Sequence, residues 1–114
     1  MIAVIFEAVV HPGQQQAYLD AAATLRPHLL EQPGFISIER FTSLADPSRL
    51  LSLSFWADEA SVRGWRCFEA HRAIQRIGRQ RIFSDYRLRV AGVIRDYGQS
   101  DRAQAPADSE PIGL

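Results

Sequence analysis

The first ten residues form an almost unbroken apolar segment. Glu7 is the single charged residue between Met1 and Val10, and His11-Pro12-Gly13 ends the segment. A short apolar segment bounded by turn residues is typical of a strand that is buried on both faces. The segment meets Glu7 early and has no basic residues before it, so it lacks the pattern of a signal peptide. The sequence therefore predicts a central strand here.

Apolar residues recur at helical spacing after Gln14. Pro27 predicts a kink in this helix, and Pro33-Gly34 predicts its end. An amphipathic helix of this kind packs one face against a sheet. That face would carry Tyr18, Ala21, Ala22, Leu25 and Leu29.

Two alternating segments follow, at residues 35–41 and 50–56. Between them, Ala45-Asp46-Pro47-Ser48 supplies residues that favour a turn. The pattern predicts two strands joined as a hairpin.

The next segment predicts a helix in two pieces. Asp58 is a plausible N-cap for a helix over residues 59–66. A single helix continued to Gly78 would mix Trp65 with charged residues on one face, so we expect a break near Cys67 and a second piece over about residues 70–80.

The C-terminal part predicts one more strand and a tail. Residues 85–97 alternate between apolar and mostly charged positions, which predicts a long last strand. Polar residues, alanine and proline dominate residues 99–114, which favours a flexible tail. We therefore predict one domain over residues 1–98, followed by this tail.

The predicted order βαββαβ indicates a ferredoxin-like α+β fold. Such an order gives a four-stranded antiparallel sheet with both helices on one face. Several strands are nevertheless apolar on both sides, which leaves an apolar sheet face without helices. Since a large exposed apolar face is unusual in a soluble monomer, we predict a homodimer that packs sheet against sheet. A different partner, or the tail folded back onto the sheet, would also cover this face.

Composition narrows the class of protein. The chain of 114 residues has a formal net charge of zero, which excludes a generally basic nucleic-acid coat. Its single cysteine, Cys67, cannot form an internal disulfide, and no apolar segment approaches the ~20 residues that span a bilayer. We expect a cytoplasmic protein with no membrane partner. Eight arginines between Arg63 and Arg89 indicate solvated helix faces and intersubunit pairing, or else a site for an anionic ligand or nucleic acid.

The common cofactor and metal motifs are absent. The glycines are isolated, so neither a dinucleotide fingerprint nor a phosphate-binding loop occurs. His11, His28 and His71 are widely spaced, which disfavours a dedicated metal site and leaves only a scattered facial triad.

Several segments occur in an order that is typical of one known family. They are residues 33–41, 51–56 and 58–60, then Trp65-Arg66 and His71-Arg72, and finally residues 85–90. With them the chain resembles the antibiotic biosynthesis monooxygenases over residues 1 to about 98. The resemblance implies dimers whose sheets pack into a barrel, with a ligand cavity between sheet and helices in each subunit. It also implies cofactor-free oxidation of a phenolic or quinol-type aromatic compound by O2, because an electron-rich anion can itself reduce oxygen.

The resemblance, together with side-chain chemistry, suggests candidate site residues. His71 would be the base or hydrogen-bond donor, since imidazole titrates near neutral pH, and Trp65 would stack on a flat substrate. Glu7 is a charge in an apolar strand, so its carboxylate must face a cavity or pair with an arginine such as Arg40 or Arg89. Both His71 and Trp65 have ordinary structural alternatives as helix-cap or core residues. Substrate-binding candidates are Arg72, Tyr86 and Gln75.

Haem is disfavoured as a cofactor. Haem-degrading members of the family use an asparagine in the first strand and a histidine ten residues after a tryptophan. This chain has Glu7 in the comparable strand, and Gln75 stands ten residues after Trp65. We therefore expect neither a cofactor nor a metal. A one-turn deletion relative to the haem-degrading members would place His71 at the ligand position, and haem could then bind.

Two other classes of function fit the same fold. One is a non-catalytic dimeric protein for ligand binding or stress. The other is RNA binding, because RNA-recognition modules share the βαββαβ order. Residues 49–56 lack the glycine and paired aromatics of those modules, so we expect no nucleic-acid partner.

Overall fold

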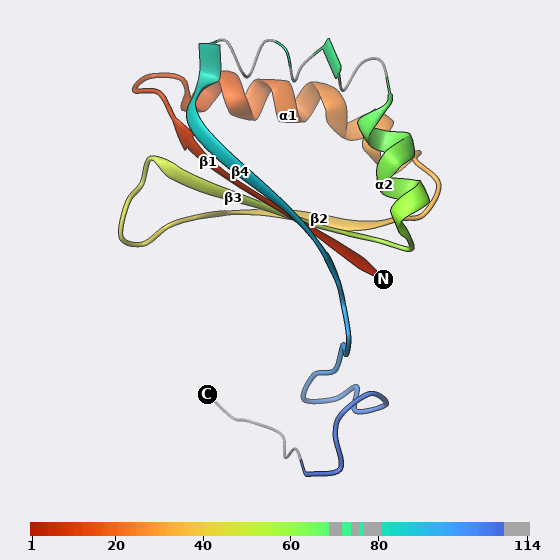
Figure 1. The fold of residues 1–114 in the computed structure, drawn as a ribbon. Helices are drawn as coiled ribbons and strands as arrows, with labels where there is room; N and C mark the ends of the chain where they lie inside the picture. Colours follow the sequence, from red (N-terminus) through yellow and green to blue (C-terminus); the bar gives the residue numbers. More distant parts are fainter. Residues whose placement is uncertain (69–71, 74–75, 77–80, 109–114) are drawn as a thin grey trace.

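A computed structural model of the chain describes residues 1–68, 72–73, 76 and 81–108. The predicted order βαββαβ is confirmed (Figure 1). The elements are β1 (Ile2–Val10), α1 (Gln15–Leu30), β2 (Phe35–Thr42), β3 (Arg49–Trp56), α2 (Glu59–Arg66) and β4 (Phe83–Gly92).

The four strands form one antiparallel sheet in the order β2-β3-β1-β4, so β1 is central, as its apolar composition predicted. Both α1 and α2 lie on the same side of this sheet (Figure 1). We call this side the helix face and the opposite side the open face. The ferredoxin-like α+β fold is therefore confirmed.

Buried apolar side chains form the core at the two ends of the helix face. At the β1–α1 end, buried residues of two strands, of α1 and of the segment just before β4 meet in one cluster: Val10, Tyr18, Leu50 and Ile82. At the β3–α2 end, Trp56 is 1% exposed and its ring packs edge-on against Phe35, at 5.2 Å between centroids. Leu29 near the end of α1 is also buried. Large apolar residues therefore exclude water at both ends.

Gly34 permits the close approach of chain segments at the β3–α2 end. Its φ of 78° lies in the left-handed region, and a methyl group there would overlap the side chain of Ser61 on α2. The Gly34 carbonyl accepts a hydrogen bond from the N–H of Ala57, at 2.7 Å. Glycine at this position thus lets the turn before β2 touch α2.

α2 begins and ends where the sequence predicted. The Asp58 carboxylate accepts hydrogen bonds from the backbone N–H and the hydroxyl of Ser61, at 2.8 and 2.7 Å. Cys67 is the C-cap, and its N–H donates to the carbonyl of Arg63 at 2.9 Å. The predicted break near Cys67 is therefore confirmed, while most of the predicted second piece lies outside the described residues.

The last strand is shorter than predicted. β4 ends at Gly92, whereas the alternating pattern suggested a strand to Tyr97. The reason is the length of its neighbour: β1 starts at Ile2, and the N–H of Val93 donates to the carbonyl of Met1 at 3.0 Å. Beyond this point no residue of β1 remains to pair with β4.

Residues 93–108 extend away from the sheet and helices (Figure 1). Beyond Val93, the N–H of Asp96 donates a hydrogen bond to the side chain of Gln104, at 2.7 Å, which lies in the same segment. Ile94 is 87% exposed. Within the part of the chain that the structure describes, no helix has the length and apolar character that crossing a membrane requires.

Candidate functional site

The middle of the helix face is less tightly covered than its two ends. The strand registers place Arg40, Ser52, Phe6 and Leu88 side by side in one row across the sheet. Ser52 and Phe6 are half-buried, and Leu88 is 52% exposed. In the helix layer, Ala21, Ala22 and Leu25 are also half-buried.

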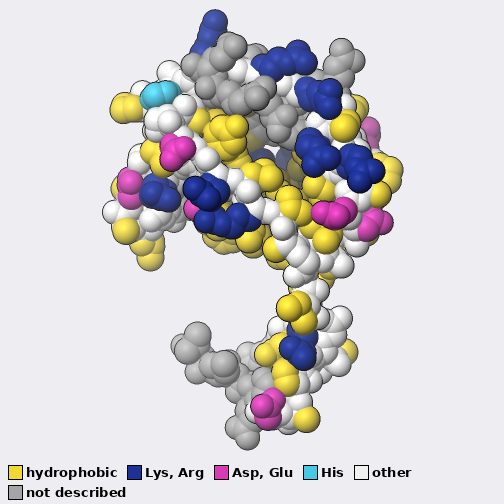
Figure 2. Space-filling view, viewed as in Figure 1, with side chains coloured by type: hydrophobic (Ala, Val, Ile, Leu, Met, Phe, Trp, Pro, Cys, Tyr) yellow, Lys and Arg dark blue, Asp and Glu magenta, His cyan; other side chains and the backbone are white. Residues whose placement is uncertain are grey.

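Small side chains explain this opening. Ser52 stands in the central part of β3, and Ala21 and Ala22 lie near the middle of α1, so the described side chains of the two layers supply little bulk there. Figure 2 shows a hollow near the middle of the domain, with both hydrophobic and Lys or Arg side chains beside it. The middle of the helix face is therefore the candidate ligand site.

An aromatic cluster lies at one side of this region. The ring of Phe6 packs edge-on against Phe83 at 5.4 Å and contacts Tyr86 at 5.8 Å, and Tyr18 of α1 contacts Phe83 at 5.7 Å. Tyr86, a predicted substrate-binding residue, is 47% exposed. It therefore presents an accessible aromatic side chain on the helix face, next to Phe6.

A polar pair lies at the other end of the same row. Nε of Arg40 on β2 donates a hydrogen bond to the hydroxyl of Tyr18, at 3.2 Å. Arg40 is half-buried and Tyr18 is buried. The sequence suggested Arg40 only as a partner for Glu7, whereas the structure places the two residues on opposite faces of the sheet.

Trp65 lies on α2, half-buried, at the β3–α2 end. Its ring stacks on Phe68 with centroids 5.7 Å apart, and Phe68 in turn contacts the ring of His28 on α1, at 5.4 Å. These three rings connect the ends of the two helices. Trp65 therefore contributes to packing at the ends of the two helices, and its role as a stacking residue for a substrate stays a prediction.

Glu7 lies on the open face. Its carboxylate forms an ion pair with Nη1 of Arg89 at 2.9 Å and a longer one with Nη2 of Arg49 at 3.9 Å. Of the two arginines that the sequence suggested as partners, the structure selects Arg89. The carboxylate is thus not brought together with Trp65 and Tyr86.

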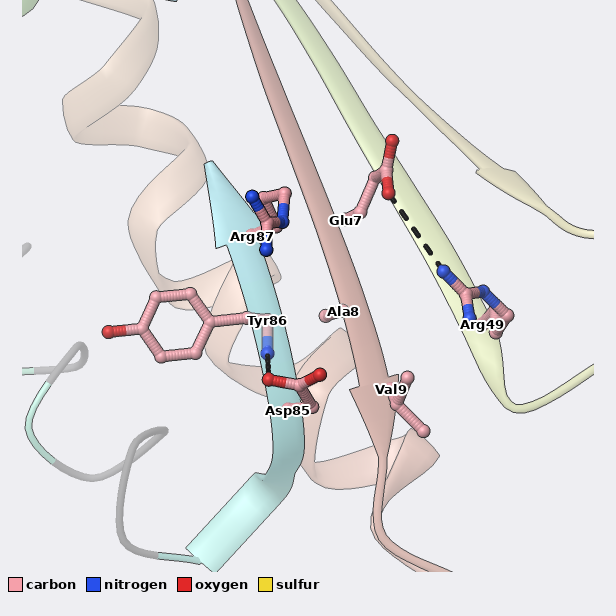
Figure 3. A pocket seen from close by; sticks show the side chains of 7 residues that line it. All are labelled: Glu7, Ala8, Val9, Arg49, Asp85, Tyr86 and Arg87. Atoms are coloured by element: carbon pink, nitrogen blue, oxygen red, sulfur yellow. Dashed lines mark hydrogen bonds and ion pairs between the residues drawn. The ribbon is translucent and has the colours of Figure 1, made fainter. Parts of the chain in front are cut away.

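The surroundings of Glu7 form a shallow depression rather than a substrate cavity. Figure 3 shows Glu7 and Arg49 directed toward one another on adjacent strands, and Tyr86 directed away from them. The depression has a volume of about 80 Å³. Since ligand sites usually measure roughly 300–1,000 Å³, this one is too small for an aromatic substrate.

Of the remaining predicted site residues, Arg72 is the one that the structure describes, and its contacts lie at the end of α2. Arg72 is exposed; its Nε donates to the carbonyl of Arg66 at 3.4 Å and its Nη2 to Sγ of Cys67 at 3.6 Å. These are contacts of a cation with the C-terminal end of α2, which such contacts stabilise. His71 and Gln75 lie outside the described residues.

Two carboxylates of the described residues have a lowered pKa, one in a helix cap and one in a turn. Hydrogen bonds from the backbone N–H and the hydroxyl of Ser61 lower the pKa of Asp58 below its usual value of 3.8. Those from the Ser48 hydroxyl and N–H do the same for the pKa of Asp46. Across the described ranges, no cluster of three or more His, Cys, Asp or Glu side chains is placed to hold a metal ion.

The pair of Arg40 and Tyr18 is the feature that sequence reasoning missed. One signal was available: in β2, Arg40 follows Ile38 by two residues, so a charge continues an apolar strand face. The sequence did not reveal that this face would lie under the helix carrying Tyr18.

Comparisons with known proteins agree with this architecture. Residues 1–77 match the profile of the antibiotic biosynthesis monooxygenase family. The chain is 46% identical over 93 residues to a protein of Pyricularia oryzae named jasmonate monooxygenase ABM. That match covers 82% of the chain and 43% of the relative, so the chain spans less than half of the fungal protein's length.

A second relative is closer to this chain in size. It is the protein YqjZ of Bacillus subtilis, 31% identical over 93 residues, with 82% of the chain and 79% of the relative covered. Among solved structures, Rv0793 from Mycobacterium tuberculosis has the same fold, with a TM-score of 0.75 at 12% identity over 83% of this chain and 96% of that one. With its profile match over most of the domain and these relatives, the chain belongs to the antibiotic biosynthesis monooxygenase family.

Proposed function

We propose that this protein is a monooxygenase of a small, largely apolar organic molecule that binds between the helices and the sheet. The observation that carries the proposal is the 46% identity to a relative named as a monooxygenase, within a family of that description. The half-buried middle of the helix face supports it. Phe6, Tyr86 and Leu88 offer apolar surface there.

The first substrate class is a phenol or quinol, oxidised without a bound cofactor. The enzyme would remove a proton from a hydroxyl group, and the resulting anion would pass electrons to O2. A quinol supplies all four electrons that O2 needs: its ring gains one oxygen atom and becomes a hydroxyquinone, and the second oxygen atom leaves as water. In this proposal His71 is the base, Trp65 stacks on the ring, and Arg72, Tyr86 and Gln75 contact the substrate.

Glu7 has no role as a base in this scheme. Its carboxylate points to the open face and is held by Arg89 and Arg49. A base must lie within hydrogen-bonding distance of the proton that it removes, and a substrate on the helix face is on the far side of the sheet.

The second substrate class is a jasmonate-like compound, favoured by the name of the fungal relative. Jasmonate is a cyclopentanone that carries an apolar chain and a carboxylate. Insertion of one oxygen atom into a C–H bond of such a molecule consumes two further electrons, so this reaction needs a reductant such as NADH or a reduced flavin. The need for a reductant therefore separates the two classes.

We further propose that the protein acts as a homodimer through the open faces of two sheets. The registers place apolar side chains of three strands on this face: Ala3, Ile5, Phe41, Leu51, Leu53 and Phe55. Phe41 is 43% exposed. A second copy would remove this apolar surface from water, and sedimentation at micromolar concentration should then give twice the mass of the chain.

Oxygen uptake and product mass test the proposed reaction. Purified protein is mixed under ¹⁸O2 with a panel of phenols and quinols, and separately with jasmonate, each with and without NADH and free flavin. We expect one labelled oxygen atom in the product of one class. Oxidation that requires no reductant identifies the phenol class, and oxidation that requires one identifies the jasmonate class.

Variants then test the residues. H71A and W65F should lower the rate by at least tenfold, and R26Q, which removes an exposed charge from α1, should leave it unchanged. A full rate in H71A and W65F would refute these roles. Binding of the panel compounds without any turnover would instead favour the non-catalytic ligand-binding alternative.

A further inference from the structure

We propose that Arg40, held in place by Tyr18, binds the carboxylate of an apolar organic acid in the space between α1 and the sheet. This inference rests on the proposed function, since it assigns the charged end of the substrate to a residue. It follows from the position of the guanidinium, its hydrogen bond and the row of side chains beside it.

Arg40 is a cation on the apolar side of the sheet without a carboxylate partner among the described residues. Its hydrogen bond within that part of the chain goes to the neutral hydroxyl of Tyr18. The ion pairs of Glu7 with Arg89 and Arg49 lie on the open face, away from Arg40. A half-buried cation is costly unless an anion or water satisfies it, so this position is suited to an anionic ligand.

Tyr18 fixes the direction of the guanidinium. The tyrosine is buried, and its ring packs edge-on against Phe83, so its hydroxyl is held in position. The hydroxyl oxygen accepts the hydrogen bond from the Nε–H of Arg40. The two Nη groups are left to donate, and a planar pair of this kind matches the two oxygens of a carboxylate.

The row across the sheet gives the ligand its shape. Arg40 is paired with Ser52, Ser52 with Phe6, and Phe6 with Leu88. Strands are about 4.8 Å apart, so the backbone positions of Phe6 and Arg40 are roughly 10 Å apart along this row. A molecule whose carboxylate binds Arg40 would therefore pass over the small Ser52 and rest its apolar part on Phe6 and Leu88.

The exposure of Leu88 agrees with this arrangement. Its side chain is 52% exposed although it stands on the helix face. An apolar ligand end in contact with Leu88 would remove that surface from water. The row thus joins a cationic end to an apolar end, which is the chemistry of an amphiphilic small acid.

A pair of ligands that differ only in charge tests the proposal. Jasmonic acid and its methyl ester have the same apolar skeleton, but only the acid carries a carboxylate. Binding of each to the full chain is measured by titration calorimetry. We expect the wild type to bind the acid at least tenfold more tightly than the ester, as a charge-assisted bidentate contact provides.

Three variants locate the effect, and a fourth, R26Q, is the control. R40Q should weaken binding of the acid at least tenfold and leave the ester nearly unchanged, and R40K should recover part of the loss because it restores the charge without the planar pair. Y18F keeps the ring but removes the hydroxyl, and should weaken acid binding a few-fold. R26Q removes an equal charge from an exposed position of α1 and should change neither ligand. Circular dichroism confirms that each variant is folded.

The outcomes separate this inference from the proposed oxygenation. Equal affinity for acid and ester in the wild type, or an unchanged preference in folded R40Q, would overturn the role of Arg40 while turnover of other substrates could stand. Acid binding that depends on Arg40 without any oxygen uptake would support the anion site and contradict the oxygenase.

Discussion

The two ends of the helix face and the middle between them are built differently. At the ends, large side chains such as Trp56, Leu29 and Ile82 are buried. In the middle, Ser52, Ala21 and Ala22 are small and only half-buried. The same two layers of structure are therefore closed at both ends and loosely filled between them.

This difference separates what holds the fold from what can hold a ligand. Burial of large apolar side chains contributes roughly 1.5–3 kcal/mol each, and the ends concentrate such residues. The middle contributes less because its side chains are small or still exposed. Changes at the ends should therefore lower the free energy of unfolding, and changes in the middle should act on binding.

The largest effect is expected at Trp56. W56A removes a ring that is 1% exposed and packed against Phe35, and it should lower the free energy of unfolding by about 3–5 kcal/mol. L25A in the half-buried middle of α1 should cost less, about 1–2 kcal/mol. Urea unfolding of both variants measures the comparison, and equal losses would contradict it.

Gly34 should have the next largest effect. Alanine there must adopt a φ of 78° and would overlap Ser61, so G34A should cost about 2–4 kcal/mol. Gly13 has the same φ but open space around it, so G13A should cost only about 1 kcal/mol. Thermal unfolding of the two variants compares strain alone with strain plus overlap. S61G removes both the Oγ and the Cβ of Ser61 that the new methyl group would overlap, and if it does not relieve G34A, the overlap is not the cause.

Filling the middle should change binding more than stability. S52L places a larger side chain between Arg40 and Phe6, and it should alter the free energy of unfolding by no more than about 1 kcal/mol, since the site is not closely packed. Binding of an apolar acid should fall at least tenfold. A23L adds similar bulk at an exposed position of α1 and serves as the control. Unchanged ligand affinity in S52L would place the ligand elsewhere.

The smallest effect concerns pH and the cap of α2. The pKa of Asp58 is lower in the folded chain than its usual value of 3.8, so the folded state favours the ionised carboxylate. The stability from this cap is present above that usual value and is lost as pH falls through the lowered one. D58N keeps a capping side chain that does not titrate in this range, so it should flatten the acid side of the stability curve. Denaturant unfolding between pH 6 and 3 tests this, and identical curves would contradict it.

The fold was largely predictable because its signals are local. Alternation in β3, helical spacing around Tyr18 and the cap at Asp58 each depend on a few neighbouring residues. The predicted end of β4 was wrong because the strand ends where its pairing with β1 ends. That pairing cannot be read from the local sequence of β4.

The site was less predictable because it depends on which strand face lies under the helices. Glu7 and Arg40 both interrupt apolar strands, and the sequence allowed them to pair with each other. The registers place them on opposite faces, so Glu7 pairs with Arg89 and Arg40 contacts Tyr18. The face on which each residue lies can be assigned only when the register of the paired strands is known.

The ion pairs of Glu7 have a consequence for how the strands find their partners. Exposed pairs of this kind add little to the free energy of unfolding. A shift of β1 by one residue, however, would turn the carboxylate toward the apolar helix side and away from Arg49 and Arg89. An unpaired charge on an apolar face costs free energy, so a sheet with β1 shifted by one residue is less stable than the native sheet. Glu7 therefore favours the native register of β1.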